Sequence, residues 1–167
     1  MRYLIGQGFG LIGTVCCLLV PMLKKKWQML VLTAVINLFF ILNLFFIDQV
    51  SSAAVINFVI MLQCLVALWH LKTNRPITKA ENILFLVIYL AGGALGFKSA
   101  IDILPIIGAL FNYLANFQPD EQKTRWLFLG NAIAFFSFYC IIGSTSMLGE
   151  LFAGTSSCAA LWKYRKK

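Results

Sequence analysis

The chain has 167 residues, of which 60% are hydrophobic and 12% are charged, and its net charge is +8. Soluble domains carry about 25% charged residues, so this chain has too few charges to cover a soluble surface. Its mean hydropathy of +0.85 points the same way. The composition excludes a soluble enzyme, a nucleic-acid-binding module and a disordered chain. It predicts an all-α membrane protein with several spans, whose surroundings are the lipid bilayer.

Apolar segments separated by short polar breaks follow one another along the chain. We predict seven transmembrane helices, over residues 3–23, 27–47, 50–71, 82–97, 101–117, 126–142 and 147–162. The fourth and the seventh have about 16 residues, or roughly 24 Å of helix, which is less than the hydrocarbon core of roughly 30 Å. Continuous apolar runs of this length are typical of helices, whereas the strands of membrane barrels alternate.

The placement of lysine and arginine favours all seven spans. With the N-terminus outside, twelve basic residues fall on the inner side, and Arg2 and Lys98 fall on the outer side. Without the short fourth span the split would be seven and seven. Because basic residues favour the cytoplasmic side, the pattern predicts an outer N-terminus and a cytoplasmic C-terminus. We therefore expect a multi-pass protein of the bacterial cytoplasmic membrane.

Matched residues indicate an internal repeat. Asn57 and Glu150 each lie twelve residues before a tryptophan, and the two pairs are offset by 93. Upstream, residues 11–13 resemble residues 106–108 at an offset of 95. The alternative is a chance match between apolar sequences.

If the repeat is real, the chain has three parts. Residues 1–75 form a first three-helix unit, residues 76–98 a single linker helix, and residues 99–167 a second three-helix unit. The linker helix lets both units begin outside and end inside. Parallel repeats about an axis along the membrane normal are a known plan for transporters.

Polar side chains inside the predicted spans are the candidate site. We predict a substrate or proton pathway from Asn57, Glu150, Ser157, Asn112 and Asn131. Glu150 is the strongest candidate, because a carboxylate near the bilayer centre must pair, face a wet cavity or hold a proton. Glu150 and Ser157 share one helix face, and the stripe through Asn57 would face it across a path. The alternatives are a solvated Glu150 near the outer interface and ordinary hydrogen bonds between helices.

Three further polar residues lie at the ends of the predicted spans. Gln7 and Asp102 match at an offset of 95, and we expect them to form an outer gate or an anchor at the outer surface. His70 stands beside Lys72 and is expected to be interfacial. The sequence contains no Ser-His-Asp set, no metal-ligand cluster and no phosphate-binding loop. We therefore expect no enzymatic activity, no metal and no cofactor.

Short motifs are spread along nearly the whole chain: Gln7-Gly8-x-Gly10, Ile56-Asn57, Ile103-Leu104-Pro105-Ile106-Ile107-Gly108, Gly149-Glu150-x-Phe152 and Trp162-Lys163-Tyr164-Arg165. They resemble motifs of the YgjV-type bacterial inner-membrane family, which has no assigned biochemical function.

The predicted architecture resembles that of the SWEET and PQ-loop carriers, which move sugars or amino acids through a central path. That resemblance implies a polar site on the last helix of each unit, where Asn57 and Glu150 stand. The chain has no Pro-Gln dipeptide, and Glu150 replaces an asparagine, so sugar transport is not implied.

The functional hypothesis is a small secondary transporter of a polar, sugar- or metabolite-like solute, with proton coupling through Glu150. The alternative is a non-transporting membrane scaffold, assembly factor or sensor subunit, because fold does not imply function. The spacing of Gly6 with Gly10, and of Gly92 with Gly96, permits close helix approach within the bundle or in a homo-oligomer.

Overall fold

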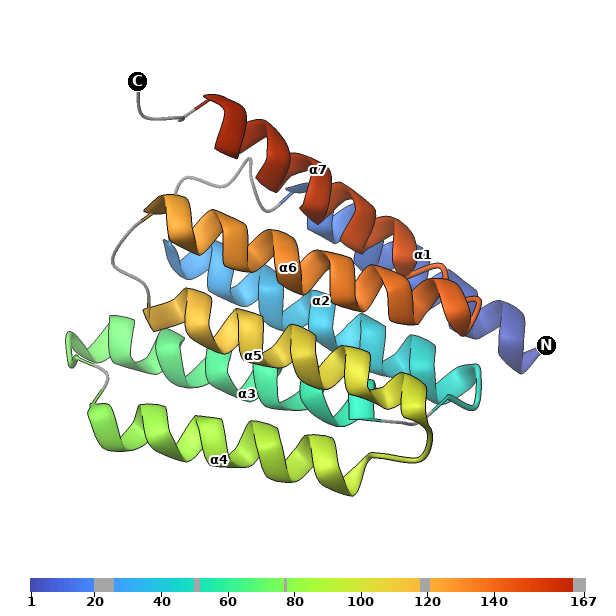
Figure 1. Ribbon diagram of the computed structural model, residues 1–167, viewed down its shortest axis with the longest axis horizontal. Helices are drawn as coiled ribbons and strands as arrows, with labels where there is room; N and C mark the ends of the chain where they lie inside the picture. Colours follow the sequence, from blue (N-terminus) through green and yellow to red (C-terminus); the bar gives the residue numbers. More distant parts are fainter. Residues whose placement is uncertain (20–25, 50–51, 77, 118–120, 164–167) are drawn as a thin grey trace.

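A computed structural model describes residues 1–19, 26–49, 52–76, 78–117 and 121–163 (Figure 1). In these ranges the elements are α1 (Arg2–Leu19), α2 (Lys26–Phe46), α3 (Ser52–Thr73), α4 (Lys79–Leu95), the 3-10 turn η2 (Ala100–Asp102), α5 (Ile103–Phe117), α6 (Glu121–Ile141) and α7 (Met147–Lys163). The prediction of seven helices is confirmed, and no strand occurs in the described ranges. The predicted start of the third span and the basic residues at 24–25 and 165–167 lie outside them.

Three helix starts differ from the predictions for local reasons. α4 begins at Lys79 because Thr78 caps it and Glu81 completes a capping box. α6 begins at Glu121, since its polar first turn consists of good helix formers that hydropathy alone does not detect. The predicted fifth span begins with the 3-10 turn η2, and regular helix follows from Ile103.

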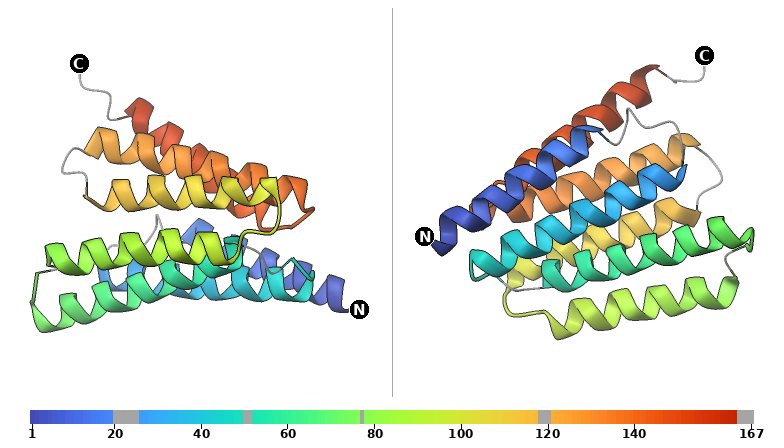
Figure 2. Two further views of the ribbon diagram at one scale, coloured as in Figure 1. Left: turned by 60° about the horizontal axis from the view of Figure 1, so that its bottom comes forward. Right: turned by 180° about the vertical axis from the view of Figure 1, so that it is seen from behind.

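The helices pack in two layers (Figure 2, left). α1, α2, α3 and α4 form one layer in chain order, and α5, α6 and α7 form the other. The layers meet where α1 packs on α7 and where α3 and α4 pack on α5. Successive helices run in opposite directions, so the start of α1 and the end of α7 lie at opposite ends of the bundle (Figure 1).

The length of the helices sets which of them could cross a bilayer unaided. Among the described residues, α3 is long and apolar enough, with 22 residues. The apolar stretches Leu30–Phe46, Ala100–Ala115 and Arg125–Ile141 are shorter.

α2 and α6 end in the same way, 95 residues apart. Asp48 and Gly143 are left-handed, with φ of 56° and 67°. The N–H of the next residue then bonds back over five positions, from Gln49 to Leu44 and from Ser144 to Tyr139, at 2.9 Å in each case. This 6→1 bond is the Schellman end of a helix, which satisfies a carbonyl that the helix leaves open.

The contacts of two glycines match at the same offset. A Cβ on Gly13 would lie 2.6 Å from the Phe40 ring, and one on Gly108 would lie 2.7 Å from the Phe135 ring. In each case a glycine on one helix, α1 or α5, admits a phenylalanine from the next helix, α2 or α6. Gly6 on α1 and Gly92 on α4 allow close packing within the bundle, since a Cβ on either would lie 2.8 Å from a side chain, that of Ile47 or Val55.

Candidate functional site

Tyr139 on α6 is the centre of a polar cluster in the core. Its ring is fully buried and packs against Phe40, Phe135 and Phe138, with ring centroids 5.7, 6.0 and 5.5 Å away. Its hydroxyl oxygen accepts a hydrogen bond of 2.9 Å from the side-chain amide of Asn57 on α3. Asn57 is itself only 3% exposed, so this bond joins the two layers in an apolar interior.

Glu150, in the first turn of α7, lies beside the same tyrosine. Its side chain is partly buried, and its carboxylate interacts electrostatically with the Tyr139 hydroxyl and with Cys17 on α1. Among the described residues, no group donates a hydrogen bond to Glu150, and none accepts the hydroxyl proton of Tyr139. A proton donor and a carboxylate acceptor therefore stand near each other without a direct bond.

The structure corrects how Asn57 and Glu150 are related. We expected their stripes to face each other across a path. The main neighbours of α3 are instead α2, α4 and α5, and those of α7 are α6 and α1. Asn57 donates a hydrogen bond to Tyr139, and Glu150 interacts with Tyr139 electrostatically. Tyr139 was not among the residues predicted from the sequence. A tyrosine among phenylalanines in an apolar segment carries no local signal of a polar role.

Gln7 fixes the turn that leads into α7. Its side-chain amide donates to the carbonyl oxygen of Gly143 and accepts from the N–H of Thr145, both at 2.7 Å. The Thr145 hydroxyl donates to the Gln7 carbonyl oxygen at 2.8 Å. α1 thereby sets the start of α7, and with it the position of Glu150 one turn later.

Asn43 on α2 holds this turn from the other side. It is fully buried, and its amide nitrogen donates to the Gly6 carbonyl oxygen at 2.8 Å. Its amide oxygen accepts hydrogen bonds from the hydroxyls of Ser144 and, at 3.1 Å, of Ser146. This network lies just after the end of α6, the helix that carries Tyr139. It was not predicted from the sequence.

Three predicted pathway residues lie away from this centre. Ser157 is two turns beyond Glu150 on α7, and its hydroxyl donates to the Ala153 carbonyl of its own helix at 2.9 Å. Asn112 on α5 is partly buried and makes no hydrogen bond to a described residue. Asn131, two turns before Tyr139 on α6, has a buried amide oxygen without a partner among the described residues.

Asp102 is buried and not at the surface as we expected, since it is 2% exposed. One carboxylate oxygen accepts from the Ser52 hydroxyl at 3.0 Å, and the other accepts from the N–H groups of Lys98 and Ser99 at 2.9 Å. Asp102 thus joins the start of α5 to the start of α3, as Gln7 joins α1 to the start of α7. Its anchoring contacts satisfy the charge that its burial would otherwise leave unpaired.

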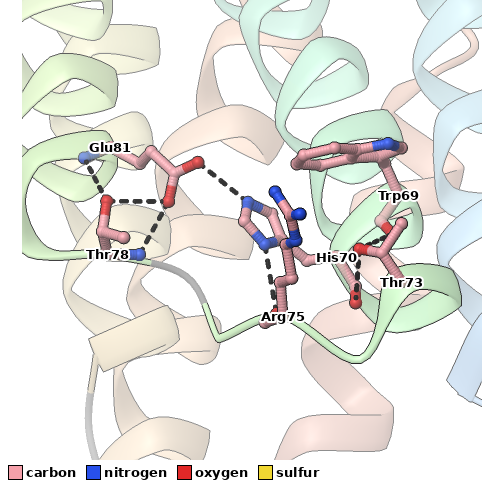
Figure 3. Close-up of polar contacts among 6 residues, drawn as sticks. All are labelled: Trp69, His70, Thr73, Arg75, Thr78 and Glu81. Atoms are coloured by element: carbon pink, nitrogen blue, oxygen red, sulfur yellow. Dashed lines mark hydrogen bonds and ion pairs between the residues drawn. The ribbon is translucent and has the colours of Figure 1, made fainter.

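A second polar cluster closes the connection between α3 and α4 (Figure 3). His70, expected to be interfacial, is 5% exposed. Its Nε2 lies 2.9 Å from a Glu81 carboxylate oxygen, and its Nδ1 lies 3.1 Å from the Arg75 carbonyl oxygen. The N–H and hydroxyl of Thr78 donate to the other oxygen of Glu81, and together with His70 they lower the pKa of that carboxyl.

Comparison with known proteins identifies a family. The model of the Imp-YgjV family, described as bacterial inner membrane protein, matches residues 4–167. Neither the curated proteins nor the solved structures contain a match to the chain. The match covers nearly every residue and confirms the resemblance carried by the short motifs. The chain therefore belongs to the YgjV-type family of bacterial inner membrane proteins.

Proposed function

We propose that the protein is a small, non-enzymatic secondary carrier of a polar solute across the inner membrane, linked to proton movement. Glu150, Tyr139 and Asn57 would bind the solute. One observation carries this proposal: a partly buried carboxylate without a hydrogen-bond donor lies beside a buried hydroxyl whose proton has no described acceptor. A solute hydroxyl or amine placed between them would accept from Tyr139 and donate to Glu150.

The electrostatics of the bundle support the proton link. A carboxylate held in apolar surroundings is unfavourable unless it is paired. Glu150 has no neighbouring cation among the described residues to offset that cost. Binding of a proton by Glu150 would offset this cost, and so would binding of a polar solute. Because both use the same carboxylate, proton binding and solute binding are coupled.

The arrangement of helices supports a repeat architecture of carrier type. The ends of α2 and α6 match at an offset of 95, and so do the contacts of Gly13 and Gly108. If the units 1–75 and 99–167 are equivalent, α1 corresponds to α5 and α3 corresponds to α7. The contact of α1 with α7 then has its counterpart in the contact of α5 with α3. Under this proposal α4 is the linker helix, the N-terminus lies outside, and the triplets rock about Tyr139 to alternate access.

A specific observation favours the second candidate, a non-transporting scaffold, assembly factor or sensor subunit. Asn43 and Asn57, two of the buried amides, are engaged in direct bonds between helices. Such bonds also hold together proteins that transport nothing, at about 0.6 kcal/mol each. The two candidate functions differ in whether Glu150 binds a solute and a proton.

The test compares wild type with Glu150→Gln, and with Ser156→Ala on the exposed face of α7 as a matched control. Purified protein is heated with a library of small polar metabolites, and each hit is then tested for uptake into proteoliposomes. A ligand at about 100 times its Kd should add about 2.7 kcal/mol of stability. The carrier proposal expects a hit and proton-driven uptake in wild type and the control, and loss of both in Glu150→Gln. Uptake that survives Glu150→Gln would refute the assigned site. No uptake of any hit would favour the scaffold.

A further inference from the structure

The α3–α4 connection holds a histidine between two hydrogen-bond acceptors. His70 lies in the last turn of α3, with Nδ1 3.1 Å from the Arg75 carbonyl oxygen and Nε2 2.9 Å from Glu81 Oε1 (Figure 3). His70 is 5% exposed, so its ring nitrogens have little access to water. This arrangement restricts how many protons the ring carries.

The number of protons follows from the partners. A backbone carbonyl only accepts, so Nδ1 must carry a proton. An ionised carboxylate also only accepts, so Nε2 must carry one as well. Glu81 is kept ionised by Thr78, whose N–H and hydroxyl donate to Oε2 at 2.7 and 2.8 Å. Even if the Nε2 proton moved onto Oε1, the pair would still hold the same two protons.

We propose that the α3–α4 connection is a proton-operated latch, closed when His70 is an imidazolium bonded to Glu81 and opened when the pair loses one proton. A neutral ring would turn the lone pair of one nitrogen toward either the Glu81 carboxylate or the Arg75 carbonyl. Both contacts are repulsive at about 3 Å, and burying a polar atom without a partner is unfavourable. The ring and the carboxylate therefore separate on deprotonation.

Among the charged groups around His70, Glu81 is the one that stabilises the protonated ring. The Arg75 guanidinium lies 6.0 Å from the Trp69 ring centroid, and that ring stands edge-on to His70 at 4.9 Å. Lys72 on α3 and Lys79 on α4 add further exposed cations nearby. These cations disfavour an imidazolium, whereas Glu81, facing the ring from α4, favours it. Removing the Glu81 charge should therefore release the extra proton.

The latch acts on the first turn of α4 alone. Further along, α4 is held by the Tyr89 hydroxyl, which donates to Gln63 on α3 at 2.7 Å, and by Gly92 against Val55. Opening the latch would free the capped end while the rest of the helix stays packed. The charge distribution predicts that this end faces the cytoplasm, so the latch would respond to cytoplasmic pH. It depends on no transport activity and goes beyond the proposed function.

The proton count can be measured directly, because His70 is the only histidine in the chain. The full-length protein, labelled with ¹⁵N-histidine in detergent micelles, is compared between about pH 5 and 8, where histidine ordinarily titrates. We expect both ring nitrogens to stay protonated to a higher pH in wild type and in Lys79→Gln than in Glu81→Gln. A neutral ring in wild type near pH 6, or identical titrations of wild type and Glu81→Gln, would overturn the proposal.

Hydrogen exchange tests the movement. After correction for the intrinsic pH dependence of exchange, amides 79–82 should lose protection in wild type as the ring deprotonates. Protection around Tyr89 should stay unchanged. In His70→Gln the protection of amides 79–82 should no longer depend on pH over this range. If that variant does not fold, wild type decides, since constant protection across the histidine titration contradicts a latch.

Discussion

The hydrogen bond between Asn57 and Tyr139 can be tested by deleting one atom. Tyr139→Phe removes the hydroxyl and keeps the ring, whose packing against the neighbouring phenylalanines accounts for the rest of its burial. The substitution therefore isolates the polar contribution. It leaves the amide of Asn57, which is 3% exposed, without its acceptor.

The expected loss follows from the burial of the pair. A hydrogen bond between helices in a membrane protein contributes about 0.6 kcal/mol on average and up to about 1.7. An amide left buried without a partner adds a penalty of about 1–3 kcal/mol. The Asn57 side chain can relax by rotating, so we expect Tyr139→Phe to destabilise the protein by about 1–2 kcal/mol.

A double-mutant cycle separates the pair from general packing. Unfolding in mixed micelles, followed by far-UV circular dichroism, is measured for Tyr139→Phe, Asn57→Ala and the double variant. We expect a coupling energy of about 1 kcal/mol. Asn37→Ala serves as the control, because Asn37 on α2 donates only to the Thr33 carbonyl of its own helix at 2.8 Å. Its cycle with Tyr139→Phe should be additive within about 0.3–0.5 kcal/mol. Additivity in the Asn57 cycle would show that the bond does not join α3 to α6, and the site would have to be redrawn.

Two other predictions address the repeat and the α4 cap. Gly13→Ala and Gly108→Ala should destabilise the protein by similar amounts, about 1–3 kcal/mol, because each new methyl meets a phenylalanine ring at 2.6–2.7 Å; a marked difference in the same unfolding assay would argue against equivalent packing in the two units. On the acid side, Thr78 and His70 lower the pKa of Glu81 in the folded protein, so this group stabilises the cap above the unfolded pKa of about 4.3 and loses that effect as pH falls through the lower folded value. After correction for the intrinsic pH dependence of exchange, the first α4 amides should therefore lose protection below about pH 4, and Thr78→Ala should weaken this dependence; equal protection at about pH 3 and 6 would contradict it.

The helices and the family could both be predicted from the amino-acid sequence. Long apolar runs and short polar breaks fixed seven helices because hydropathy is a local property, and the structure places their ends within a few residues of the predictions, apart from residues outside the described ranges. The polar first turn of α6 was missed, since helix propensity and capping extend a helix past its apolar part. The short motifs indicated the family, and the family match over residues 4–167 confirms it.

The partners of the polar side chains could not be predicted from the sequence, because they depend on how the helices pack. Asn57 bonds to Tyr139, Asp102 is buried against Ser52, and His70 bonds to Glu81 across a turn. In a soluble helix the apolar stripe announces which face packs inward. Here almost every face is apolar, because lipid is as apolar as the protein interior, so the sequence leaves the rotation and the neighbours of each helix undetermined. Close packing of small and large residues determines the rotation and the neighbours of each helix. These in turn determine which polar groups come into contact.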